Sequence, residues 1–361
     1  MADDSIKLGA VLPFSGGVEL YGIQAKLGLD LATKEINAGG GILGRPLEVI
    51  YEDDQTDPAV AVKVTRKLIE RDGVLAVVGP ITSRNLNAIK PTIERTKTPL
   101  LYATNYEGGA CSHYIFSFSS VPNQELAQLL PYMNQTFGNT YYMLGADHAW
   151  PHKMFEDAQP IILGLGGHTL GKEFTTGKET DFTPLIERIA ATKAKVLLFA
   201  LKGDGLSFIP QAHDLGLLND ITVAFLGLSE TDLPAFGGKG QNMFVVVPFV
   251  ASSDIPSVKA FVAKVKAEAG ADATVSNYVM THYDALIAMK AALEKAGKVD
   301  KEAMINALEG LVIQSPTGAV TIGKNHHVTM NMFLAKTEGA GLITVRALGE
   351  IAPEPGCKSD E

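Results

Sequence analysis

Short apolar runs alternate with amphipathic segments along the first part of the chain. The runs at 6–13, 47–54, 74–80 and 98–104 read as strands, and helical patterns at 20–38, from Asp57-Pro58 onward and at 83–97 lie between them. Asp57 followed by Pro58 predicts a helix start, because aspartate is a preferred N-cap and proline is tolerated at the first helical position. Continuous apolar strands that alternate with amphipathic helices are typical of a parallel sheet covered on both faces.

The same alternation restarts after residues 114–124. The expected helices are 124–137, 151–163, 182–191 and 206–215, and the expected strands are 140–147, 168–174, 195–201 and 221–228. After the run at 242–250 the pattern changes to three helices at 257–269, 277–295 and 301–308, a strand at 318–323, and a hairpin-like pair at 328–336 and 342–348. These late helices have no strands of their own to cover, so we expect this segment to return to the first sheet.

The predicted fold class is therefore α/β, with two doubly wound parallel-sheet lobes. Crossings near Val121, Val247 and Asn325 would form a three-segment hinge, a geometry that permits closure about a cleft. The predicted N-terminal lobe is 5–121 plus 248–324, the C-terminal lobe is 122–247 plus 325–352, and the tail is 353–361.

The totals of the chain agree with two domains and exclude some partners. A chain of 361 residues exceeds the roughly 250 to 300 at which one core stops growing. A net charge of −9 with scattered lysine and arginine argues against a nucleic-acid partner. The apolar runs are too short to span a bilayer, so we expect no membrane insertion. The start, Met1 to Ser5, lacks the pattern of a secretory leader, which fits either a cytoplasmic protein or a mature periplasmic one.

Ligands of open parallel sheets bind outside the carboxyl ends of the strands, and the loops there carry chemistry. Thr82, Ser83, Thr104 and Asn105 place hydroxyl and backbone N–H groups where carboxylate or carbonyl oxygens can be bound. The alternative for Ser83 is that it only caps its helix.

Aromatic and charged residues occupy the other loops. Tyr102, Tyr106, His148 and Trp150 are large flat side chains, and Trp150, the only tryptophan, would form either a lid over a ligand or part of the core. Glu230 would neutralise a ligand amine and Lys202 a carboxylate, or each would be a solvated loop charge.

Catalytic, cofactor and metal motifs are absent from the sequence. It contains no Gly-x-Ser-x-Gly, no His-Glu-x-x-His and no GxxxxGK[ST], so we expect no enzyme, no cofactor and no metal. The adjacent His326 and His327 would point to opposite faces of a strand, one hydrogen-bonded and one exposed. Cys111 and Cys357 would form one disulfide in an oxidising compartment or remain free thiols.

The opening "IKLGAVLPFSGGVELYGIQAKLGLDLATKEINAGGGILGRPL" and the residues up to 69 resemble the leucine/isoleucine/valine-binding family, the type I periplasmic binding proteins of ABC importers. The likeness runs nearly end to end. Residues 102–124, 145–152 and 315–327 are most similar to the amide- and urea-binding branch, which includes a cytoplasmic amide-sensing regulator. The resemblance implies a small-molecule ligand and a membrane permease as partners.

The resemblance also implies a site. The predicted ligand-binding residues are Ile81, Thr82, Ser83, Tyr102, Ala103, Thr104, Asn105, Tyr106, His148, Trp150, Lys202, Gly203 and Glu230. In the amino-acid binders the serine and threonine loops hold a carboxylate and an acidic residue meets the amine, positions that correspond to Ser83, Thr104 and Glu230. His148 and Trp150 stand where the amide regulator has tyrosines, and Ile81 replaces an aromatic residue, so the pocket shape is not inherited.

These expectations converge on a periplasmic protein that captures an amino acid, a short amide or a urea-like compound in an interlobe cleft by hinge closure. One alternative is a cytoplasmic amide sensor of the same fold. Another is a binder of aromatic carboxylic acids, which Trp150, His148 and Lys202 suggest. An amidohydrolase is a further, more distant alternative.

Overall fold

The computed structural model describes residues 5–176 and 179–357 of the chain. Contacts between Cα atoms divide the chain into two compact units. Unit 1 consists of Met1–Ser120, Ile255–Asn331 and Glu350–Glu361, and unit 2 consists of Val121–Asp254 and Met332–Gly349. The second and third passages between the units therefore fall somewhat later in the chain than the crossings expected near Val247 and Asn325.

Unit 1 contains a five-stranded parallel sheet with the order β2-β1-β3-β4-β5. Its strands are β1 (Ile6–Leu12), β2 (Leu47–Asp53), β3 (Ala76–Val78), β4 (Leu100–Tyr102) and β5 (Ile115–Ser117). All residues of β3, β4 and β5 are buried, as expected for strands covered on both faces. Strand β5 was not predicted, because serines interrupt the short apolar run at Ile115 and Phe116.

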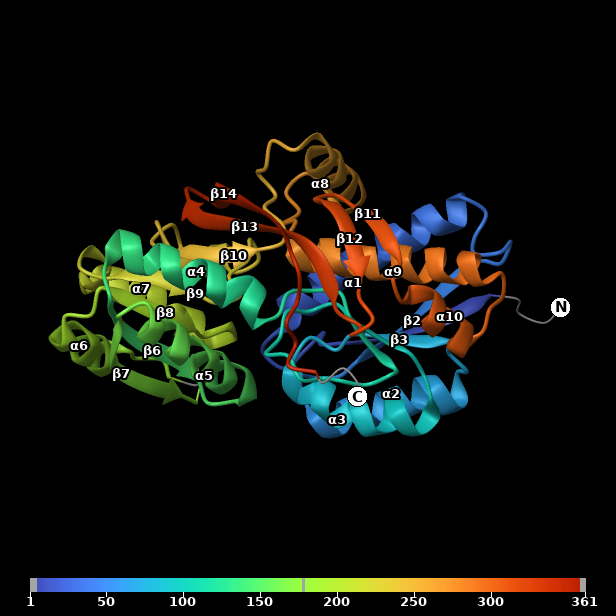
Figure 1. The fold of residues 1–361 in the computed structure, drawn as a ribbon, viewed down its shortest axis with the longest axis horizontal. Coiled ribbons are helices and arrows are strands. Elements are labelled where there is room, and N and C mark those ends of the chain that lie inside the picture. The colour runs from blue at the N-terminus through green and yellow to red at the C-terminus, as the bar shows by residue number, and fades with distance from the viewer. Residues whose placement is uncertain (1–4, 177–178, 358–361) are drawn as a thin grey trace. The chain divides into compact units, whose positions relative to one another are not determined.

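Helices cover both faces of this sheet, with α2 and α3 on one side and α1 and α9 on the other (Figure 1). Those from the first part of the chain are α1 (Glu19–Ala38), α2 (Pro58–Arg66), its π-helical continuation η1 (Lys67–Arg71) and α3 (Ser83–Thr96). Asp57 caps α2 as predicted, since its carboxylate accepts hydrogen bonds from the backbone N–H groups of Ala59 at 2.8 Å and Val60 at 3.0 Å.

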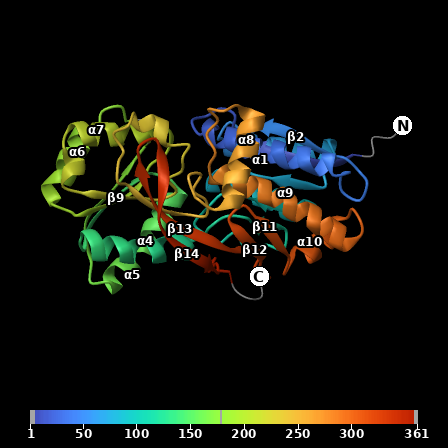
Figure 2. The same ribbon diagram turned by 90° about the horizontal axis from the view of Figure 1, so that it is seen from above.

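The later helices of unit 1 are α8 (Pro256–Ala269), α9 (Asn277–Ala296) and α10 (Lys301–Leu308), followed by the strands β11 (Val312–Ser315) and β12 (Gly318–Ile322). Helix α9 runs alongside α1 (Figure 2). Gly28 permits this approach, because a Cβ atom at its position would lie 2.1 Å from the carbonyl oxygen of Val279. The segment after Ile255 thus shares the core of the first sheet.

Unit 2 repeats the same strand order, as β7-β6-β8-β9-β10. Its parallel strands are β6 (Thr140–Ala146), β7 (His168–Thr175), β8 (Val196–Ala200), β9 (Thr222–Phe225) and β10 (Phe244–Val247). Its helices are α4 (Pro122–Phe137), α5 (Ala149–Gly164), α6 (Thr183–Thr192) and α7 (Phe208–Asp214), with the short 3₁₀ turns η2 (Gly203–Ser207), η3 (Leu217–Asn219) and η4 (Leu233–Phe236). Helices α6 and α7 lie on one side of β9 and α4 and α5 on the other (Figure 2).

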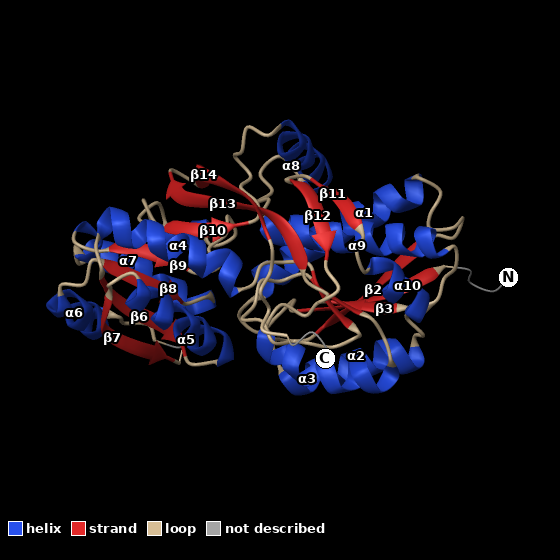
Figure 3. Ribbon diagram, in the orientation of Figure 1, coloured by secondary structure: helices blue, strands red, loops and turns tan. Residues whose placement is uncertain are grey.

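The predicted hairpin near the end of the chain is confirmed. It consists of β13 (Val328–Glu338) and β14 (Gly341–Ile351), shown as long red arrows in Figure 3. The first residues of β13 pair with β12, and its later residues pair antiparallel with β10. In the described ranges, 5–176 and 179–357, no helix combines the length and the apolar character that a membrane span needs.

Candidate functional site

Both sheets have a switch point where loops on neighbouring strands lead in opposite directions, and this is where ligands of doubly wound sheets bind. It lies between β1 and β3 in unit 1 and between β6 and β8 in unit 2. The predicted residues follow β3 and β4 in unit 1 and β6, β8 and β9 in unit 2. Within each unit, therefore, the structure gathers its predicted residues at the carboxyl edge of one sheet.

Ser83 does not cap α3. The N-cap is Thr82, whose side-chain oxygen accepts a hydrogen bond from the N–H of Asn85 at 3.3 Å, so the capping alternative for Ser83 is wrong. The buried Ser83 hydroxyl instead donates to Oε2 of Glu107 at 2.5 Å. Glu107 was not among the predicted site residues, although it lies in the loop that follows β4. Its presence in that loop was the only sequence signal, and loop membership does not show which side chains meet.

The two tyrosines of unit 1 that were predicted to bind ligand donate their hydroxyl protons to other groups of the protein. Tyr102 donates to the carbonyl oxygen of Ile81 at 3.2 Å. Nδ1 of His327 lies 2.6 Å from the carbonyl oxygen of Asn325, which can only accept, so Nδ1 carries a proton. Burial lowers the pKa of His327 to about 4, which leaves the ring neutral and Nε2 an acceptor. Tyr106 consequently donates its hydroxyl proton to Nε2 of His327 at 2.6 Å.

Thr104 differs from these neighbours. Its side chain is buried, and among the described residues its hydroxyl oxygen has no hydrogen-bond partner. The loop around it is held in place, because Thr281 donates to the carbonyl oxygen of Ala103 at 2.6 Å. Asn105, the next residue, is half-buried. Thr104 is thus a fixed and uncommitted hydroxyl at the end of β4.

In unit 2, Trp150 occupies the first turn of α5 and is only 9% exposed. Its indole N–H, a group that usually finds a partner when buried, has none within the described part of the chain. His148, at the N-cap position of α5, is exposed. Trp150 is therefore buried as a core residue would be, yet it retains an unused donor.

Glu230 follows β9 and is 8% exposed. Its Oε1 accepts a hydrogen bond from the N–H of Ala251 at 2.8 Å, whereas Oε2 has no partner among the residues that the structure describes. Burial raises the pKa of this carboxyl to about 7. A cationic or N–H-donating group placed at Oε2 would supply the missing partner and favour the ionised form.

The ammonium group of Lys202 forms hydrogen bonds with other residues of unit 2. Its ammonium donates to the carbonyl oxygen of Gly227 at 2.6 Å and to Oδ2 of Asp232 at 2.7 Å, and it lies 5.2 Å from the ring centre of Phe225. The Asp232 side chain is fully buried, so the pair balances a charge that would otherwise be costly. Gly203, at a positive φ of 58°, begins η2 directly after it. Lys202 joins the loops after β8 and β9, and a ligand carboxylate would have to compete with Asp232.

The expectation for the two adjacent histidines is wrong. His326 and His327 lie in the turn before β13, His326 at a positive φ of 60°, so the alternation of a strand does not apply. Both are buried, and His326 contacts Glu309 through Nε2 at 3.1 Å. Over residues 5–176 and 179–357, no group of three or more histidine, cysteine, aspartate and glutamate side chains could hold a metal ion.

A disulfide joins Cys111 to Cys357, with their Cα atoms 5.5 Å apart. The N–H of Gly109 also donates to the carbonyl oxygen of Pro355 at 2.8 Å. Both contacts lie within unit 1. They attach the end of the described chain to the loop that begins at Thr104.

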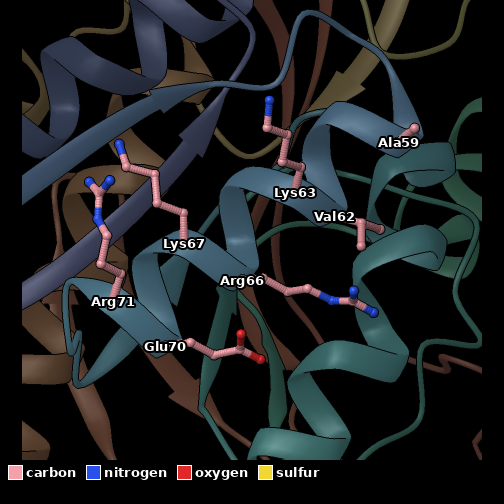
Figure 4. Close-up of a pocket in the computed structure, with 7 residues that line it drawn as sticks. All are labelled: Ala59, Val62, Lys63, Arg66, Lys67, Glu70 and Arg71. Carbon is pink, nitrogen blue, oxygen red and sulfur yellow. The ribbon is translucent and has the colours of Figure 1, made fainter.

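A surface pocket of about 620 Å³ on α2 and η1 lies elsewhere in unit 1 (Figure 4). Lysines and arginines form most of its lining, and Lys63 and Arg66 point in different directions. Three of its charges pair with residues outside it, Lys67 with Glu52, Glu70 with Arg95 and Arg71 with Asp72. These features are typical of a solvated charged face, and none of the predicted ligand-binding residues lines this pocket.

Two doubly wound α/β units, with uncommitted buried polar groups at the carboxyl ends of their strands, define a type I periplasmic solute-binding protein. A comparison with protein families leads to the same assignment. The chain belongs to the periplasmic binding protein family, whose model matches residues 5–341.

Relatives agree with this assignment. The Leu/Ile/Val-binding protein BraC3 of Rhizobium johnstonii is 28% identical over 351 residues, which cover 95% of this chain and 94% of that protein. The fold is also that of an ABC transporter solute-binding protein from R. palustris in complex with benzoate, with a TM-score of 0.88, 20% identity and coverage of 98% and 99% of the two chains. A leucine-binding protein from Thermotoga maritima has a TM-score of 0.86 at 18% identity, with coverage of 95% and 99%.

Proposed function

We propose that this protein, a solute-binding protein of the ABC transporter class, captures an amino acid, a short amide or a urea-like compound. The observation that carries the proposal is a set of three buried polar atoms that have no partner among the described residues: Oγ1 of Thr104, Nε1 of Trp150 and Oε2 of Glu230. Thr104 and Glu230 stand on the loops after β4 and β9, and Trp150 stands in the first turn of the helix that follows β6.

These three atoms lower the stability of the protein while no ligand is bound. A buried donor or acceptor without a partner costs about 1–3 kcal/mol, and buried polar groups in proteins are nearly always paired. A ligand with hydroxyl, carbonyl or N–H groups would remove this cost at all three positions. Glu230 adds a preference for a positively polarised group, because an ammonium or amide N–H at Oε2 would stabilise the carboxylate that burial disfavours.

An aromatic carboxylic acid is the second candidate ligand. The indole N–H of Trp150 is a donor that a carboxylate would accept, and the R. palustris protein of the same fold was solved with benzoate. Against this candidate, the charge of Lys202 is already balanced by Asp232. Amino acids are supported by the names of the Leu/Ile/Val-binding relatives.

The remaining parts of the proposal come from the sequence expectations. The protein would act in the periplasm, hold the ligand between its two lobes by hinge closure, deliver it to a membrane permease and leave it chemically unchanged. The solved structures named above include components of ABC transporters, which supports a transport role over a cytoplasmic sensor.

The test is a binding screen read by thermal shift, calorimetry and the fluorescence of Trp150. The panel is leucine, isoleucine, valine, butyramide, acetamide, urea, benzoate and 4-hydroxybenzoate. We expect at least one amino acid or amide to bind, and mass spectrometry of that ligand after long incubation to show it intact. A chemically altered ligand would restore the enzyme alternative.

Thr104→Val and Trp150→Ala test the site. We expect each substitution to raise the dissociation constant of the best ligand at least tenfold. Thr33→Val is the matched control, because the Thr33 hydroxyl is also buried without a partner among the described residues but lies on α1, away from these loops. If the two site variants bind the best ligand as tightly as the control does, the proposed site is wrong.

A further inference from the structure

We propose that Glu107 makes the Ser83 loop of unit 1 a subsite for a hydrogen-bond donor of the ligand, an amide, amidinium or ammonium group, and not for a carboxylate. The inference rests on the proposed function, which it deepens by naming the chemistry of one end of the ligand. It also reverses the role that the resemblance implied for Ser83, that of holding a carboxylate.

The hydroxyl proton of Ser83 is already used in a hydrogen bond to Glu107. Ser83 has a single hydroxyl proton, and Oε2 of Glu107 lies 2.5 Å from its oxygen. A hydroxyl that donates to a carboxylate at this distance makes a strong charge-assisted hydrogen bond. Ser83 can then offer a ligand only the lone pairs of its oxygen, so it acts as an acceptor.

The hydroxyl groups of two nearby tyrosines also donate to other groups of the protein. Tyr102 gives its proton to the carbonyl oxygen of Ile81, and Tyr106 gives its proton to His327. Burial first, and then the nearby charge of Glu107, raise the pKa of Tyr102, so this hydroxyl keeps its proton for Ile81. Neither tyrosine therefore has a hydroxyl proton left to donate to a ligand.

Thr104 lies on the neighbouring loop, and its hydroxyl has no hydrogen-bond partner among the described residues. Strands β3 and β4 pair in register with Val78 opposite Leu101, so the loops that carry Ser83 and Thr104 leave adjacent strands. Thr104 is 5% exposed and its Oγ1 has no partner in the described ranges, so this hydroxyl is available to a ligand atom. The Thr104 hydroxyl can rotate to donate or to accept a hydrogen bond. The preference of the subsite for a ligand donor therefore comes from Ser83 and Glu107.

The experiment compares ligands that share one body and differ in one group. Benzoate, benzamide and benzamidine form an aromatic series, and butyrate, butyramide and butylamine form an aliphatic one. Dissociation constants are measured by calorimetry for the wild-type protein and for Glu107→Gln. Glutamine keeps an oxygen that can accept from Ser83 but removes the charge. Glu302→Gln is the matched control. Glu302 is a carboxylate of the same unit that lies on α10, where its Oε2 is 3.1 Å from Nε2 of His113.

In the series that binds, we expect the wild-type protein to prefer the amide or the cation over the acid at least tenfold. Glu107→Gln should reduce that preference about tenfold, while Glu302→Gln leaves it unchanged. The inference is overturned if the wild-type protein prefers the acid, or if Glu107→Gln leaves the preference as it was.

The design separates this failure from failure of the proposed function. If the wild-type protein does not prefer the amide or the cation, but Thr104→Val still weakens ligand binding, the proposed function stands and only the role of Glu107 is rejected. If neither series nor the amino acids bind the wild-type protein, the proposed function fails, and the inference fails with it. Circular dichroism of each variant checks that the fold is retained.

Discussion

Asp284 is a buried carboxyl group on α9 whose titration should make unit 1 less stable as the pH rises. It is 2% exposed, and its Oδ2 accepts a hydrogen bond from the hydroxyl of Ser315 at 2.6 Å. Its Oδ1 has no partner within the described residues. Burial raises the pKa of Asp284 from 3.8 to about 7, although the Ser315 hydrogen bond lowers it.

The direction and size of the effect follow from proton binding. The folded protein holds this proton up to about pH 7, whereas the unfolded chain releases it near pH 4. Between these values the folded state binds more protons, so the free energy of unfolding falls as the pH rises. The contribution of Asp284 is complete below about pH 4 and is lost by about pH 7. Each pKa unit corresponds to about 1.4 kcal/mol, so the full loss is on the order of 4 kcal/mol.

Asp284→Asn tests this reasoning, because the amide stays neutral and keeps an oxygen for Ser315. Urea unfolding is measured at pH 5 and pH 8 for both proteins, with hydrogen exchange in α9 to assign the effect to unit 1. The wild-type protein should lose several kcal/mol more than the variant between the two pH values. Glu230, whose pKa is also raised to about 7, titrates in both proteins and cancels in the difference. An equal pH dependence of the two proteins would refute the reasoning.

Two further predictions concern packing and the cross-link. Gly28→Ala should cost about 3 kcal/mol, because the new Cβ would lie 2.1 Å from the carbonyl oxygen of Val279 and force α1 away from α9; Gly164→Ala, with open space around it, is the control, and equal losses in thermal unfolding would contradict the prediction. Replacing Cys111 and Cys357 by serine should cost about 3–5 kcal/mol, and reductant should lower the stability of the wild-type protein but not of this variant.

The elements that the sequence predicted well show either a continuous apolar run or a full helical period. The helix at 20–38 corresponds to α1 (Glu19–Ala38), and the strand at 47–54 to β2 (Leu47–Asp53). Strands β5 (Ile115–Ser117) and β11 (Val312–Ser315) were not predicted, because polar residues interrupt their short apolar runs. Pairing with neighbouring strands makes such short segments into strands, and pairing is a tertiary property.

The loops of the candidate site were predictable, but their internal pairings were not. Parallel strands bring their carboxyl ends to one edge, so the position of Ser83 and Thr104 in neighbouring loops follows from the strand pattern. The partner of Ser83 is 24 residues away in the chain, and that of Tyr106 is 221 residues away. No local pattern encodes such pairs, because they depend on which segments pack together.

The amino-acid pattern was enough to predict the class of this protein: two α/β units, the strand ends at which we expect a ligand, and the residue types at those ends. Those properties depend on hydrophobic period and on strand direction, which are local. Folding determines which polar groups already have partners: Lys202 is paired with Asp232, whereas Oε2 of Glu230 has no partner in the described part of the chain. A hydrogen bond requires distances of about 3 Å, and only folding brings groups from distant parts of the chain that close together.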